Sequence, residues 1–134
     1  MKSFKKKYGH QVTQNTSLFQ TIYHAWAGVL DLFKGERNFR LHFTIALLLC
    51  LVGMCLHIRP LAWVCLLTVI FFVLIAETIN TIVETLVNLV VGRHYNVLAK
   101  KVKDVAAGGV MISSIFAAIV AIIIFVPVIL HFLK

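Results

Sequence analysis

Three long apolar runs, over residues 41–58, 61–76 and 105–130, constrain this chain more than any other feature. At about 1.5 Å per residue, the first run is just long enough to cross a hydrocarbon core of roughly 30 Å as a helix. Of the 134 residues, 60% are hydrophobic and only 13% are charged. So small a soluble chain could not cover that much apolar surface. The sequence therefore predicts an all-α integral membrane protein and excludes a soluble or disordered chain.

The apolar runs define the expected helices. We expect a single domain over residues 1–134 with three membrane helices, at about 41–58, 61–91 and 105–132. Arg59 and Pro60 form the turn between the first two, because proline suits the first position of a helix. The helical pattern of the second segment continues beyond its apolar run, and Gly92 is a typical helix stop.

The region before the first run is more polar. Residues 1–16 are rich in Lys, Gln and Asn, which is typical of a flexible cytoplasmic tail. Residues 18–34 place apolar side chains three and four positions apart, but Gln20, His24 and Asp31 interrupt them. This segment is too polar to cross a membrane. It is expected to be an amphipathic interfacial helix in the headgroup region.

Positive charges gather on one side of the predicted helices. The chain has 13 Lys and Arg against 5 Asp and Glu. Seven of the basic residues precede the first run and four lie between the second and third runs: Lys2, Lys5, Lys6, Lys7, Lys34, Arg37 and Arg40, then Arg93, Lys100, Lys101 and Lys103. Only Arg59 and Lys134 fall on the opposite side. By the positive-inside rule, the N-terminus is cytoplasmic and the C-terminus outside. The charge therefore indicates orientation, and no nucleic-acid partner is expected.

The second predicted membrane helix carries a polar stripe. Glu77 and Glu84 are two helical turns apart, and Asn80 and Asn88 fall near the same face. Burying a carboxylate in mid-membrane costs on the order of 2.5–3.5 kcal/mol on insertion scales, so such groups normally mark function. Glutamate can bind Mg²⁺ together with substrate phosphates, act as a general base, or line a proton path. The stripe alone leaves these roles open.

Other charged groups are expected at the membrane depth of Glu84. Glu36 and Arg40 lie where the surface helix meets the first span, and Lys103 and Asp104 lie where the third span starts. As an N-cap, Asp104 would place Lys103 at the positive end of that helix, where anions bind. Together these groups suit a nucleotide phosphate and its metal. The chain has no glycine-rich phosphate-binding motif, so side chains and the metal would hold the phosphates.

Simpler roles compete with this interpretation. Glu84 could pair with Lys100 or Lys101, and each cation alone could anchor to lipid headgroups. A small oligomeric ion or proton transporter could use Glu77 and Glu84 as its path. However, the third run offers only Ser113 and Ser114 as further polar lining. A structural adaptor would have no need for the stripe.

At these positions the chain resembles the small prokaryotic lipid kinases of the diacylglycerol kinase and undecaprenol kinase family. The resemblance covers about residues 17–125 and rests on the stretches 36–42, 77–84 and 98–108, which read ERNFRLH, ETINTIVE and LAKKVKDVAAG. It implies three membrane helices and an amphipathic surface helix, assembled as a homotrimer in a bacterial plasma membrane. It also implies a kinase that uses ATP as co-substrate and Mg²⁺ as cofactor.

The resemblance implies catalytic and metal-binding roles. Glu36 and Glu84 hold the Mg²⁺ that bridges the ATP phosphates, and Glu77 takes the proton from the lipid hydroxyl. Asn80 supports Glu77, and Lys103 contacts the terminal phosphate. Phosphoryl transfer needs mainly positioning and charge neutralisation, so a metal, a lysine and one base are a sufficient set.

The resemblance also implies binding residues around that set. The other ATP-binding residues are Asp104, which fixes Lys103, and Asn88, His94 and Tyr95. Trp26 and Arg40 border the lipid entrance beside Glu77. The family usually has Asp at the position of Asn88, so this chain lacks one charge there. The Asn-Phe-Arg-Leu-His form of residues 38–42 resembles the Gram-positive branch, which favours undecaprenol as the substrate, with diacylglycerol as the alternative.

The start of the third run is rich in small residues. Ala106, Ala107, Gly108 and Gly109 are followed by Ser113 at small-residue spacing. Because small side chains allow membrane helices to approach closely, we expect this end to pack tightly against the Glu77–Glu84 helix.

Overall fold

The computed structural model describes residues 17–92 and 94–132 of the chain. The expected tail over residues 1–16 and the basic Lys134 lie outside the described residues. Four helices follow one another: α2 (Leu18–Gly35), α3 (Arg37–Cys55), α4 (Pro60–Val91) and α5 (Val97–Phe132). The α2 helix belongs to one compact unit, and α3, α4 and α5 form a second.

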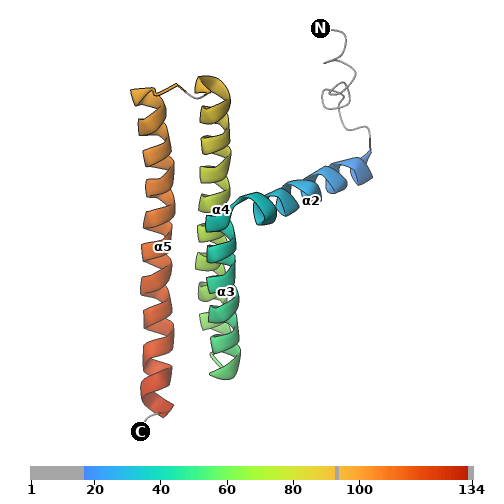
Figure 1. Ribbon diagram of the computed structural model, residues 1–134. Helices are drawn as coiled ribbons and strands as arrows, with labels where there is room; N and C mark the ends of the chain where they lie inside the picture. Colours follow the sequence, from blue (N-terminus) through green and yellow to red (C-terminus); the bar gives the residue numbers. More distant parts are fainter. Residues whose placement is uncertain (1–16, 93, 133–134) are drawn as a thin grey trace. The chain divides into compact units, whose positions relative to one another are not determined.

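The second unit is built from three long apolar helices. Each of α3, α4 and α5 is long and apolar enough to cross a membrane, with 19, 32 and 36 residues. The α4 helix packs against α5 along its length, and α3 packs against the part of α4 that follows Pro60 (Figure 1). The chain is therefore a membrane protein, and the part that the structure describes is all-helical, as the composition predicts.

Two of these helices begin before their apolar runs. The α3 helix begins at Arg37 and ends at Cys55, whereas the first run covers 41–58. The α5 helix begins at Val97, eight residues before the third run. An apolar run shows which part of a helix can lie in hydrocarbon. It does not show where the helix begins, because charged residues can be helical outside the hydrocarbon core. In α4, Pro60 occupies the start and Gly92, with a φ of 60°, provides the stop.

The apolar core lies at the turn between α3 and α4. Ile58, Leu66 and Phe125 are buried together, and Trp63 packs against them. Gly53 lies directly beneath this turn, where a Cβ atom would come within 3.1 Å of both Ile58 Cδ1 and Trp63 Cη2. This close packing fixes α3 against α4.

The small residues at the start of α5 do not all face the interior as expected. Ala106 and Val110 face inward and are half-buried and buried, respectively, whereas Ala107 and Gly109 are exposed. A Cβ atom built at Gly108 or Gly109 would meet nothing within 4 Å in the chain. The expectation of tight packing against α4 at these glycines is therefore wrong within one chain, because the rotation of α5 turns the Gly109 face outward.

The first unit contributes one amphipathic helix. The α2 helix has 18 residues, and its large apolar side chains are exposed: Leu18, Phe19, Ile22, Tyr23, Trp26, Val29 and Leu30. An exposed apolar face of this kind is what an interfacial helix buries in the headgroup region.

Candidate active site

The polar stripe of α4 runs along the face that the helix buries. Glu77 is only 2% exposed and Asn80 only 6%. Glu84 is half-buried, and Asn88 is exposed near the end of the helix. Toward Pro60 the same face continues with buried apolar residues, namely Leu66, Val69 and Val73. The stripe therefore ends at Glu77 and does not extend through the membrane as the lining of an ion path would.

Several buried polar atoms along α4 and α5 have no hydrogen-bond partner among residues 17–92 and 94–132. They are Asn80 Oδ1, Thr81 Oγ1 and Ser114 Oγ. Most buried polar atoms in native proteins are paired, and each exception needs an explanation. Substrate, water or a second chain could supply the missing partners. The sequence did not single out Thr81, because it lies beside the stripe and a threonine within an apolar helix is common.

Glu36 brings a second carboxylate toward Glu77. It is the N-cap residue of α3, with extended backbone geometry (φ −104°, ψ 111°), but its side chain makes no capping hydrogen bond. Glu36 and Glu84 both lie close enough to Glu77 for their charges to act on it. Carboxylates from α3 and α4 therefore act on Glu77 together.

The carboxylates present fit a magnesium ion only if the substrate contributes ligands. Within the described residues, no group of three or more His, Cys, Asp or Glu could hold a metal by itself. Mg²⁺ usually binds through one or two carboxylates together with substrate phosphates and water. The half-buried carboxylates of Glu36 and Glu84 match that donor set in kind and number.

Lys103 reaches this face from α5. Its Nζ donates a hydrogen bond to Asn88 Oδ1 at 2.7 Å, across 15 residues of sequence. The bond places the ammonium group at the end of the α4 stripe. Among residues 17–92 and 94–132, Glu84 forms no ion pair with Lys100 or Lys101, so the simplest competing role for Glu84 has no support.

Asp104 differs from its expected role. It lies inside α5 and not at its start, and its Oδ2 accepts a 2.6 Å hydrogen bond from Lys100 Nζ. It does not fix Lys103, because adjacent residues of a helix point in different directions, whereas residues four apart share a face. The N-cap is Asn96, whose Oδ1 accepts hydrogen bonds from the Leu98 and Ala99 amides at 2.8 and 3.1 Å. Asparagine before an apolar run is a common N-cap signal.

A polar cavity of about 390 Å³ lies at the α4–α5 connection. Its lining includes five of the seven residues expected to bind ATP, namely Asn88, His94, Tyr95, Lys103 and Asp104. The remaining two, Glu36 and Glu84, lie outside this lining, nearer Glu77. A nucleotide in this cavity would have its phosphates near Lys103, which lies on the α4 side of α5.

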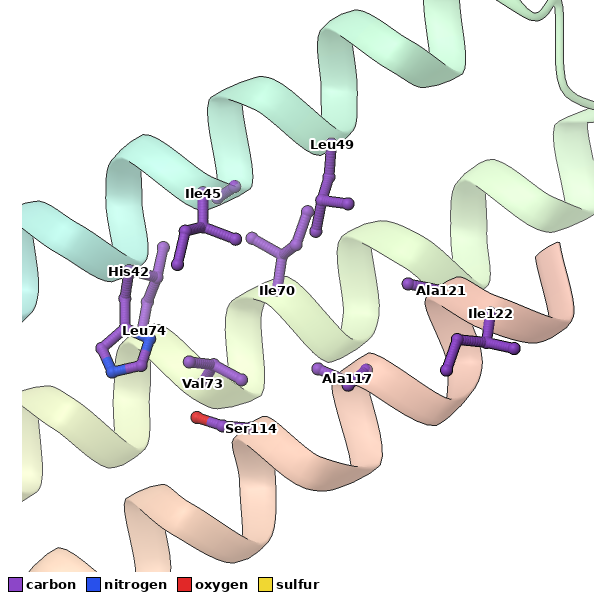
Figure 2. Close-up of a pocket in the computed structure, with 12 residues that line it drawn as sticks. His42, Ile45, Leu49, Ile70, Val73, Leu74, Ser114, Ala117, Ala121 and Ile122 are labelled. Atoms are coloured by element: carbon purple, nitrogen blue, oxygen red, sulfur yellow. The ribbon is translucent and has the colours of Figure 1, made fainter. Parts of the chain in front are cut away.

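A second cavity, of about 410 Å³, is apolar and lies over α4 between α3 and α5. Figure 2 shows His42 and Ser114 at one end and Leu49 and Ile122 toward the other. Alanines on α3 and α5 keep it open: Ala46, Ala117, Ala118 and Ala121. Glu77 lies outside this lining and follows the lining residue Val73 by one helical turn. An apolar chain with a polar head would fit this polarity.

Comparison with known proteins decides the family. Residues 23–125 match the family described as prokaryotic diacylglycerol kinase, which is more than half of the chain. The chain belongs to the prokaryotic diacylglycerol kinase family. The resemblance seen in the sequence is therefore confirmed, and the family is one of membrane lipid kinases.

Individual members of this family carry two substrate names. The chain is 38% identical to a diacylglycerol kinase of Synechocystis over 115 residues. This alignment covers 86% of this chain and 65% of that protein. The chain is 30% identical to the undecaprenol kinase of Bacillus subtilis over 109 residues. This alignment covers 81% of this chain and 88% of that protein. The chain is 26% identical over 110 residues to the diacylglycerol kinase of Escherichia coli. The chain thus spans just under two thirds of its Synechocystis relative.

Two residues that the family resemblance assigns to lipid are not among the lining residues of either cavity. Arg40 is exposed in the first turn of α3, and its backbone carbonyl accepts a 2.8 Å hydrogen bond from Thr44 Oγ1. Trp26 is 64% exposed on α2, in the other unit. Both present side chains that a lipid could contact.

Proposed function

We propose that this protein phosphorylates a membrane lipid alcohol with ATP as the phosphate donor and Mg²⁺ as the cofactor. The supporting observation is the hydrogen bond from Lys103 of α5 to Asn88, at the end of the α4 face that buries Glu77. In this proposal Glu77 accepts a proton, Glu84 of α4 and Glu36 at the start of α3 bind the metal, and Lys103 meets a phosphate. Family membership supports the same reaction.

Each group has a role that follows from its chemistry. Glu36 and Glu84 would hold the Mg²⁺, which neutralises phosphate charge when bound. Glu77 would be the general base, because it is buried among apolar residues and its carboxylate has no ion-pair partner in the described chain. Asn80, one turn away and also buried, would orient Glu77 or the substrate through its unpaired oxygen.

The proposed step is a direct transfer. The lipid hydroxyl oxygen forms a bond to the γ-phosphorus of ATP while the bond from that phosphorus to the β–γ bridging oxygen breaks, which releases ADP. Glu77 takes the hydroxyl proton. Lys103 offsets the charge on the transferred phosphoryl group, and His94 and Tyr95 contact the nucleotide in the polar cavity.

The apolar cavity supports a lipid acceptor. His42 and Ser114 lie at the end of the cavity opposite Leu49 and Ile122, and Glu77 follows the lining residue Val73 by one helical turn. A lipid chain lying along Leu49 and Ile122 would carry its hydroxyl toward the base. Trp26 and Arg40 would border the entrance. We propose undecaprenol as the acceptor, supported by the Gram-positive form of residues 38–42 and by the Bacillus subtilis relative. Diacylglycerol is the alternative, supported by the name of the Synechocystis relative.

We also propose the setting of the reaction. The family resemblance supports a homotrimer in a bacterial plasma membrane. Three spans would put the start of α3 and the end of α5 on opposite sides, and by the positive-inside rule the Lys103 side would be cytoplasmic. The ATP site would then face the cytoplasm, where ATP is found.

Purified protein should transfer labelled phosphate from ATP to undecaprenol or diacylglycerol when Mg²⁺ is present. Side-by-side rates on the two lipids identify the acceptor. Glu84→Gln and Glu36→Gln should each raise the Mg²⁺ concentration needed for half-maximal rate, because each removes one metal ligand. Lys101→Met, which removes an exposed lysine outside the proposed site, is the matched control. A folded protein that labels neither lipid would contradict the proposed function.

A further inference from the structure

The contact between Lys103 and Asn88 joins the ends of α4 and α5 through their side chains. The 2.7 Å distance from Nζ to Oδ1 is within the range for a hydrogen bond donated by a charged group. Lysine has three donors on a flexible stem of four carbons. Without such an acceptor the ammonium group of a half-buried lysine would sample many positions.

The acceptor of this hydrogen bond, the Asn88 amide oxygen, is neutral, so the positive charge of Lys103 in the polar cavity is not offset. An amide oxygen can fix the direction of the ammonium group without cancelling its charge. The neighbouring carboxylate does not cancel it either, because Asp104 is bound to Lys100 at 2.6 Å. Lys100 and Asp104 thus form a separate pair, and Lys103 keeps its positive charge toward the polar cavity.

We propose that Asn88 is a positioning residue for Lys103: its amide oxygen holds the lysine ammonium at the cavity without offsetting its charge, so that the ammonium can bind an anionic triphosphate. This inference rests on the proposed function, and it assigns Asn88 to Lys103 and not to the nucleotide. An aspartate at position 88 would hold Lys103 as well but would place a negative charge beside the phosphates. A leucine would provide neither.

A labelling experiment tests the contact without any turnover. The purified full chain is treated with an amine-acetylating reagent, and modification of Lys103 is followed by mass spectrometry, with Lys101 as the internal control. Asn88→Leu should raise the rate at Lys103 several-fold and leave Lys101 unchanged, whereas Asn88→Asp should keep Lys103 protected. Equal Lys103 rates in the wild type and Asn88→Leu would overturn the inference. Asn88→Ala serves as a second variant if the leucine impairs folding.

The same experiment separates this inference from the proposed function. MgATP should protect Lys103 of the wild type from acetylation. A wild type that MgATP does not protect would contradict the proposed nucleotide site, whatever the effect of Asn88→Leu without nucleotide. If Asn88→Leu makes Lys103 easier to acetylate in the absence of nucleotide, that result supports the contact between Asn88 and Lys103 independently of the nucleotide site.

Steady-state kinetics then test what the contact does. Asn88→Leu should lower kcat roughly 10- to 100-fold, the range for a lost hydrogen bond to a charged group. Asn88→Asp should preserve kcat to within about threefold but raise the KM for MgATP several-fold, because the added charge repels the phosphates. A merely structural Asn88 would not give this split between kcat and KM. An unchanged kcat in Asn88→Leu, or a lower KM in Asn88→Asp, would refute the positioning role.

Discussion

The two halves of α4 bury the same helix face with opposite chemistry. In the apolar half, residues 60–75, Leu66 is fully buried and packs with Ile58 and Phe125. In the polar half, residues 76–91, the most buried residues are Glu77 and Asn80, and the Asn80 oxygen has no partner in the described part of the chain. One helix thus combines a close-packed segment with a segment whose polar groups are incompletely paired.

This difference shows where the chain favours function over stability. Membrane helices associate through packing and hydrogen bonds, because lipid tails are as apolar as leucine. The apolar half is built for packing. The polar half carries a buried carboxylate, which destabilises a membrane helix by about 2.5–3.5 kcal/mol on insertion scales. We infer that the apolar half holds α3, α4 and α5 in place so that the polar half can keep its reactive groups.

The largest expected effect comes from removing the charge of the polar half. Glu77→Gln should lower turnover by about 10²- to 10⁴-fold, the usual contribution of a general base. Binding of MgATP should change little, because in the proposed function Glu77 acts on the lipid hydroxyl and binds neither the metal nor the nucleotide. The melting temperature should stay the same or rise, since a neutral amide is easier to bury than a carboxylate. Lipid phosphorylation, nucleotide binding and thermal unfolding in detergent measure these three effects.

The control for this variant removes a carboxylate elsewhere. Asp31→Asn changes an exposed acid of α2 and should leave turnover unchanged. If Glu77→Gln weakened MgATP binding as strongly as turnover, Glu77 would be a metal or nucleotide ligand and not the base.

The apolar half should respond in the opposite way. Leu66→Ala leaves a cavity in the core formed with Ile58 and Phe125 and should destabilise the protein by about 2 kcal/mol. This is the lower end of the range for soluble cores, because the unfolded reference also lies in lipid. At temperatures where the variant is folded, turnover should stay near the wild-type value. Leu67→Ala, which truncates a half-exposed neighbour, is the matched control and should cost little. A stable Leu66→Ala protein without activity would show that the two halves are not separable.

The division of α4 was largely predictable from the sequence. The positions of Glu77, Asn80, Glu84 and Asn88 place them on one face, and the structure buries the first two. Their spacing is a property of a single helix, so periodicity is sufficient. The start of α5 was not predictable from hydropathy, because charged residues continue the helix back to Val97.

Contacts between helices were harder to predict. The bond from Lys103 to Asn88 depends on how α4 and α5 rotate about their axes, which residue spacing within either helix does not determine. The same rotation turns Gly109 outward, although its small size suggested a buried position. The partner of Asp104 could have been predicted, since Lys100 lies four residues before it on the same face.

The smallest expected effects distinguish two glycines. Gly53→Ala in the apolar half brings a Cβ atom to 3.1 Å from Ile58 and Trp63, and overpacking of this kind destabilises by about 1–3 kcal/mol. Gly109→Ala adds a methyl group where nothing lies within 4 Å, so in a single chain it should stabilise α5 by about 0.5–1 kcal/mol. Thermal unfolding of the two variants, with the oligomeric state measured by light scattering, compares them directly.

The response of Gly109 also bears on the proposed homotrimer. If Gly109→Ala stabilises the protein and leaves its oligomeric state unchanged, the glycine face of α5 is exposed to lipid. If it destabilises the protein and dissociates the oligomer, a helix of a second copy approaches that face closely, since only a small residue permits such an approach. The Gly53 variant should show no change in oligomeric state in either case, because its close contacts lie within one chain.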